Sequence, residues 1–205
     1  MSYSYQYKLS LKPEETFNVN YVNNICKHYP NSKILIEVQN TKGISSTMLK
    51  QLNSNILIRI AGGYDTDRIN RYGKDLFWSS NYYYDSVIYT QNETIKIVEE
   101  MEKIESGINK NWSDIQKVLY IYERLKTKVM YDPKFEKKLS DETRSLRGLI
   151  TKKTVCAGYS MIFKEMLDRI GIDCEYVEGF TTPDKKGGGM LGILLILMEK
   201  NIQSI

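Results

Sequence analysis

Histidine is almost absent from this chain of 205 residues, which contains only His28. Histidine is the usual general base of enzymes and a common metal ligand, and none follows residue 28 in the sequence. The three cysteines, Cys26, Cys156 and Cys174, are an odd number without paired spacing, which argues against a disulfide framework or a zinc site. We therefore expect no cofactor and no metal.

Long apolar runs and a basic start are also missing. The longest apolar run, Met190 to Met198, is far shorter than the roughly 20 residues of a membrane-spanning helix. The first seven residues lack the basic and apolar parts of a secretory signal. The net charge of +4 is mild, and basic residues alternate with acidic ones, unlike a nucleic-acid-binding surface. We expect a soluble cytoplasmic protein without membrane or nucleic-acid partners, and the composition leaves its oligomeric state open.

The first half of the chain alternates short apolar runs with helical segments. Residues 33–38 and 55–60 are rich in branched apolar residues and predict buried strands, and residues 83–89 predict a third strand. Residues 22–28 and 45–52 fit short helices, the second with a serine cap. This order predicts a small N-terminal α/β unit.

A charged helix over residues 92–106 is expected next, with Gly107 at its end. The polar stretch 106–111 then marks a boundary, so we expect an N-terminal unit of unknown role over residues 1–107 and a second domain over residues 108–205.

The second domain begins with a capping-box pair, Ser113 and Gln116. The apolar residues that follow have helical spacing and predict one core-facing stripe, Ile115, Val118, Leu119, Tyr122 and Leu125. Tyr131 and Asp132 precede Pro133, which accounts for the end of this helix, although both side chains could also line a cleft.

The segment most suggestive of chemistry is Thr154–Tyr159, with Cys156 at the predicted start of a helix. The apolar positions that follow form a helical stripe: Tyr159, Ile162, Phe163, Met166, Leu167 and Ile170. Gly171 fits a left-handed cap, and residues 172–178 alternate as a half-buried strand. A cysteine in the first turn of a helix faces free N–H groups and the positive end of the helix dipole, which favour the nucleophilic thiolate.

The three cysteines and His28 can each be explained by a structural role instead of a chemical one. Cys156 is either a nucleophile or a small buried hydrophobic residue. Cys174 alternates inward on a strand and Cys26 lies within a helix, so core packing accounts for both. His28 precedes the cysteine helix and is expected at the surface or at a helix cap.

The second half of the chain resembles the transglutaminase-like superfamily. The resemblance rests on Ser145–Leu149, on Val155–Tyr159, on Phe163-Lys164 and on Leu167–Ile172, and it covers roughly residues 110–185. It implies a papain-like α+β core that carries a Cys-His-Asp triad. With the small N-terminal α/β unit that the apolar pattern predicts, the expected fold class of the chain is α+β. It also implies thiol acyl transfer on a protein or peptide substrate, with Cys156 as the catalytic nucleophile.

The histidine of that family follows the cysteine helix in a GHAWN-like segment, where this chain has Gly189-Met190-Leu191-Gly192-Ile193. The codons ATG-CTT-GGA-ATA encode Met-Leu-Gly-Ile, and the same bases read one position earlier, after a C, give CAT-GCT-TGG-AAT, or His-Ala-Trp-Asn. We therefore expect a shifted reading frame after Gly189 and a domain that is incomplete at its C-terminus. With His and Asp missing, the chain is expected to be inactive. The alternative is a non-catalytic binding module that retains the cleft of the fold.

Overall fold

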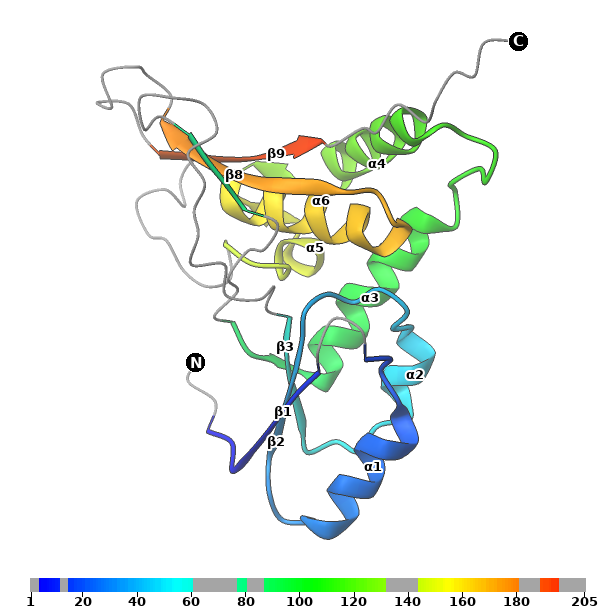
Figure 1. Cartoon of the computed structure of the whole chain (residues 1–205), viewed down its shortest axis with the longest axis vertical. Coiled ribbons are helices and arrows are strands. Elements are labelled where there is room, and N and C mark those ends of the chain that lie inside the picture. Colours follow the sequence, from blue (N-terminus) through cyan, green and yellow to red (C-terminus); the bar gives the residue numbers. More distant parts are fainter. Residues whose placement is uncertain are drawn as a thin grey trace.

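The computed structural model describes residues 4–11, 15–60, 77–80, 87–131, 144–180 and 189–195. Within them the chain combines helices with two larger sheets, one in each half of the molecule (Figure 1). The fold class is α+β, as the sequence predicts. None of the helices in these ranges is long and apolar enough to cross a membrane.

The first half of the chain forms a four-stranded sheet in the order β1-β2-β3-β5. Its strands are β1 (Tyr7–Ser10), β2 (Ile34–Val38), β3 (Ile56–Ile60) and β5 (Tyr89–Thr90). The first three are parallel, and β5 is antiparallel to β3. Consecutive residues of β2 and β3 are buried because both faces of these strands are covered. The strands expected at 33–38 and 55–60 are confirmed, whereas most of the strand expected at 83–89 lies outside the described residues.

Two helices connect the parallel strands, α1 (Val19–His28) and α2 (Ser46–Lys50). Asn18 caps α1 and Ser45 caps α2, and each side chain accepts a hydrogen bond from a backbone N–H of the first turn. Both helices agree with the sequence prediction, except that α1 begins earlier than residue 22.

Helix α3 (Gln91–Glu105) lies between the two halves and contacts α2 as well as α5 (Gly148–Thr151). Thr90 and Glu93 form a capping box at its start. Its buried residues are Thr94, Ile97, Val98, Met101 and Ile104. The helix predicted over 92–106 is therefore confirmed.

Helix α4 (Asp114–Lys128) starts with the expected capping box, but its predicted core-facing stripe is only partly right. The buried residues are Val118, Ile121 and Leu125. Three members of the predicted stripe are solvent-exposed instead: Ile115 at 44%, Leu119 at 56% and Tyr122 at 52%. The apolar residues of α4 are distributed around more than half of its circumference. The spacing of apolar residues therefore could not tell which side of the helix packs inward.

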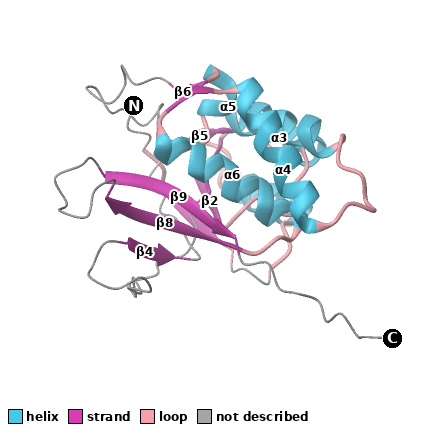
Figure 2. Cartoon of the chain, turned by 90° about the horizontal axis from the view of Figure 1, so that it is seen from above, coloured by secondary structure: helices cyan, strands magenta, loops and turns pink. Residues whose placement is uncertain are grey.

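The second half centres on α6 (Cys156–Ile170), which is followed by an antiparallel pair of strands. These strands are β8 (Cys174–Phe180) and β9 (Gly189–Leu195). β4 (Phe77–Ser80), from the first half of the chain, pairs with β8 and completes a three-stranded sheet (Figure 2). Figure 2 shows this sheet on one side and the helices on the other.

One contiguous apolar core joins the two halves, because buried residues from the first sheet, α3, α4 and α6 belong to the same cluster. β4 likewise crosses from the first half to the sheet of the second. The boundary near residue 107 stays a prediction.

Candidate active site

Cys156 is the first residue of α6, as the sequence predicts. Val155 before it is extended, with φ −108° and ψ −178°, and no side chain caps the first turn. The N–H groups of that turn and the helix dipole favour negative charge near the sulfur. Cys156 is partly exposed, whereas Cys26 and Cys174 are buried. Cys156 therefore combines partial solvent exposure with a place at a helix N-terminus.

A pair of short parallel strands holds the chain just ahead of Cys156. β6 (Met130–Tyr131) pairs with β7 (Lys153–Thr154), so that Tyr131 lies opposite Thr154. The hydroxyl of Tyr159, one turn into α6, donates a hydrogen bond to the carbonyl of Val129. These contacts fix the end of α4 and β6 to the head of the cysteine helix.

Close packing beneath this segment leaves little room for a side chain at Gly148. A Cβ atom there would lie 3.0 Å from Cβ of Thr154 and 3.1 Å from Cδ1 of Ile162. Thr154 is completely buried, which anchors the strand that leads into Cys156. The position of the sulfur is thus set by packing on both sides of the helix start.

The other two cysteines are in environments that suppress thiolate formation. Burial raises the pKa of the Cys174 thiol to about 12, although Lys164 opposes the shift. Burial also raises the pKa of Cys26. Both lie in the core, as the sequence predicts.

The remaining residues singled out in the sequence are dispersed. His28 is exposed at the end of α1, which Figure 1 shows at the opposite end of the molecule from α6. Tyr131 is 44% exposed beside the segment that precedes Cys156, and Asp132 lies outside the described residues. Among the described residues, no cluster of three or more His, Cys, Asp or Glu residues could hold a metal ion.

The segment after Gly189, where the family's histidine is expected, forms the start of β9. Phe180 pairs with Gly189, and Gly179 pairs with Met190. Figure 1 shows β8 and β9 running alongside α6, and both strands contact this helix. Position 190 is therefore on a strand that contacts the cysteine helix.

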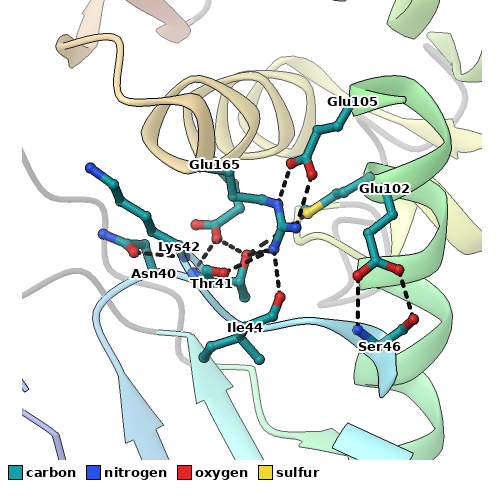
Figure 3. Close-up of polar contacts among 10 residues, drawn as sticks. Asn40, Thr41, Lys42, Ile44, Ser46, Glu102, Glu105 and Glu165 are labelled. Carbon is teal, nitrogen blue, oxygen red and sulfur yellow. Dashed lines mark hydrogen bonds and ion pairs between the residues drawn. The ribbon is translucent and has the colours of Figure 1, made fainter. Parts of the chain in front are cut away.

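Sequence reasoning missed a buried polar cluster on α6, shown in Figure 3. Glu165 is fully buried and accepts hydrogen bonds from the backbone N–H and the hydroxyl of Thr41, in the turn after β2. Arg169, one turn further along, donates to the carbonyls of Thr41 at 2.8 Å and Ile44 at 3.0 Å and pairs with Glu105 of α3. We call these five residues the α6 junction. The signal available in the sequence was a pair of ionisable residues four positions apart, Glu165 and Arg169, beside the apolar stripe of this helix.

Charge pairing stabilises the cations of α6. Burial lowers the pKa of Arg169, but the hydrogen bond and charge of Glu105 outweigh it and raise that pKa above its ordinary value. Lys164 is also buried, and its ammonium donates to Asp168 at 2.9 Å and to the carbonyl of Cys174 at 3.1 Å. The second contact fastens the start of β8 to the cysteine helix.

Comparison with known families identifies the second half of the chain. Residues 102–200 match the sequence model of the transglutaminase-like superfamily. This segment contains α4, α5, α6, β8 and β9, and Cys156 lies within it. This segment, slightly less than half of the chain, is therefore similar to the transglutaminase-like superfamily. No curated protein matches the chain.

Proposed function

We propose that this protein is related to cysteine-dependent acyl-transfer enzymes, with Cys156 at the nucleophile position of a papain-like core. The observation that carries this proposal is the placement of a partly exposed cysteine as the first residue of α6, inside the segment that matches the superfamily. A helix start supplies backbone N–H groups and a favourable dipole, which is the environment that an attacking thiolate needs.

The reaction that fits this site is thiol acyl transfer on a protein or peptide amide. The sulfur of Cys156 would attack the amide carbonyl carbon, the C–N bond would break, and the leaving amine would take up a proton. The resulting thioester would be resolved by water, giving proteolysis or deamidation, or by a second amine, giving a cross-link. The proton transfers require a base, ordinarily a histidine oriented by a carboxylate.

Within the 205 residues no histidine follows Cys156, and His28 is remote from it. A polypeptide of these residues is therefore expected to have little acyl-transfer activity, because removal of one triad member usually costs several orders of magnitude in rate. A shifted reading frame after Gly189 would supply His-Ala-Trp-Asn at positions 190–193, at the start of β9. DNA sequencing tests this directly: a base other than C before the codon of Met190 excludes it.

A non-catalytic binding module is the second candidate, and Met190, at the position where the family's histidine is expected, favours it. Thiol labelling separates the two. At pH 7, iodoacetamide should modify Cys156 about 3–10-fold faster than a control thiol at the C-terminal end of a helix. The helix dipole favours a thiolate at the N-terminal end and disfavours it at the C-terminal end. Ser106→Cys in a Cys156→Ala background supplies that control, since Ser106 is exposed at the C-terminal cap of α3.

Equal labelling rates would remove the evidence for an activated sulfur and leave the binding module. Mass spectrometry of the modified peptides assigns the label to each cysteine, so the buried Cys26 and Cys174 do not confuse the comparison.

A further inference from the structure

A cavity of about 390 Å³ opens at the carboxyl ends of the parallel strands β1 and β2, in the N-terminal sheet. It is lined by Leu11 after β1, by residues 15–17 before α1, and by residues 38–40 and 42–44 at and after the end of β2. Ligands of parallel α/β sheets bind at this edge, beyond the carboxyl ends of the strands. The volume also falls within the range of small-molecule sites, about 300–1,000 Å³.

The polar side chains around this cavity include several hydrogen-bond donors. The Oδ1 atom of Asn40 accepts from the backbone N–H of Lys42 at 3.0 Å, which leaves the amide nitrogen of Asn40 as a donor. Figure 3 shows this nitrogen and the ammonium of Lys42 extending away from the α6 junction. Thr16 and Gln39 add a hydroxyl and a second amide to the lining.

Lys42 is the cation of the described lining and can pair with an anion. Lys42 has no ion-pair partner among the described residues, while Asp168, which attracts it at longer range, is paired with Lys164 at 2.9 Å. Glu15 is the one acidic residue of the described lining, and it already interacts with another group. An ammonium and amide donors together suit a carboxylate, through charge-assisted hydrogen bonds.

Apolar side chains complete the cavity: Leu11, Phe17, Val38 and Ile44. An inorganic ion would make no apolar contact with these side chains, whereas the hydrocarbon part of an organic anion would pack against them. We propose that this cavity binds a small organic carboxylate, with Lys42 and Asn40 at the carboxylate group and the apolar residues around its hydrocarbon part. The site is independent of Cys156 and does not rest on the function proposed above.

The turn that lines the cavity also provides a matched control. Asn40 and Lys42 line the cavity, but Thr41 between them donates its hydroxyl to Glu165 of the α6 junction. A substitution at Thr41 therefore disturbs the junction and spares the donors of the cavity. A substitution at the exposed Lys42 does the reverse.

The test is an NMR titration of the full chain with three probes: hexanoate, its neutral analogue hexanamide, and inorganic phosphate. Hexanoate should cause saturable shifts in backbone amides of residues 15–17 and 38–44. Lys42→Met should weaken hexanoate binding about tenfold or more, which is the effect of losing a hydrogen bond to a charged group. Thr41→Val and Lys27→Met, the latter an exposed lysine of α1, should leave the affinity within about twofold.

Hexanamide should bind to the unmodified protein about tenfold more weakly than hexanoate. This comparison needs no variant, so it does not depend on whether a variant folds. Equal binding of hexanoate and hexanamide, unchanged affinity in Lys42→Met, or no saturable shift with hexanoate would overturn the proposal. Tighter binding of phosphate than of hexanoate would overturn the assignment to organic carboxylates.

Discussion

The guanidinium of Arg169 and the carboxylate of Glu105 form a two-pronged ion pair that joins α6 to α3. Nη2 lies 3.0 Å from Oε2, and Nε donates to Oε1. Two-pronged pairs of this kind fix orientation as well as distance. Because the same guanidinium bonds the carbonyls of Thr41 and Ile44, one side chain ties the cysteine helix to both α3 and the N-terminal sheet. Contacts with the N-terminal unit therefore help to hold α6 in place.

Arg169→Met should destabilise the protein strongly. The side chain of Arg169 is only 8% exposed, and its removal leaves Glu105, the two carbonyls and the nearby Glu165 without their cation. Breaking a buried pair in this way costs about 3–5 kcal/mol of unfolding free energy. Urea unfolding measures it. Lys103→Met is the control, because the side chain of Lys103 is 62% exposed and its partner Glu100 keeps Lys128 and Lys152, so the loss should be less than about 1 kcal/mol. Equal losses in the two variants would contradict a buried anchoring role.

Glu100 gives the stability a defined pH dependence. It accepts hydrogen bonds from Lys103, Lys128 and Lys152 at 2.7, 3.1 and 2.7 Å. Burial raises its pKa, but the three lysines outweigh that effect and lower the pKa from 4.5 to about 2. A depressed carboxyl pKa contributes stability that is complete above pH 4.5 and is lost as the pH falls toward 2.

Glu100→Gln should therefore lower the unfolding free energy at pH 7 by about 1–2 kcal/mol, allowing for solvent screening. The difference from the unmodified protein should shrink as unfolding is followed from pH 5 down to pH 3. A difference that stays constant over this range would show that the carboxylate charge is not responsible.

Gly148→Ala should test the packing under the head of α6. The added methyl group meets Thr154 at 3.0 Å and Ile162 at 3.1 Å, so overpacking should cost about 1–3 kcal/mol. Ile162→Val removes the Cδ1 atom that clashes, and the double variant should lose less than the sum of the two single losses. Thermal unfolding of the four proteins measures this coupling. Additive losses would exclude the predicted contact.

Helix α4 offers a direct test of which apolar stripe is buried. Ile121→Ala should cost about 2–5 kcal/mol, because Ile121 is completely buried. Leu119→Ala, two residues earlier on the same helix, should stay within about 0.5 kcal/mol, since Leu119 is 56% exposed. Chemical denaturation of both variants distinguishes the stripes, and a large loss at Leu119 would restore the stripe predicted from the sequence.

Local signals in the sequence were sufficient for most helices and for the buried strands. Capping boxes at Thr90 and Ser113, and the left-handed Gly171 with φ 77°, act over a few residues, so their effect is visible in the sequence. The short strands β1, β4, β6 and β7 were not predicted, because a strand of two to four residues is defined by its pairing partner rather than by its own pattern.

The sequence by itself determined the α+β class, the helix that begins at Cys156, and the resemblance to the transglutaminase-like superfamily. Only the tertiary structure decided which side of α4 is buried, that Thr41 reaches Glu165 across 124 residues of sequence, and that a cavity opens beside Lys42. The physical reason is the range of the interactions. Caps and periodicity depend on neighbours in the chain, whereas burial, ion pairing and cavities depend on segments that only folding brings together.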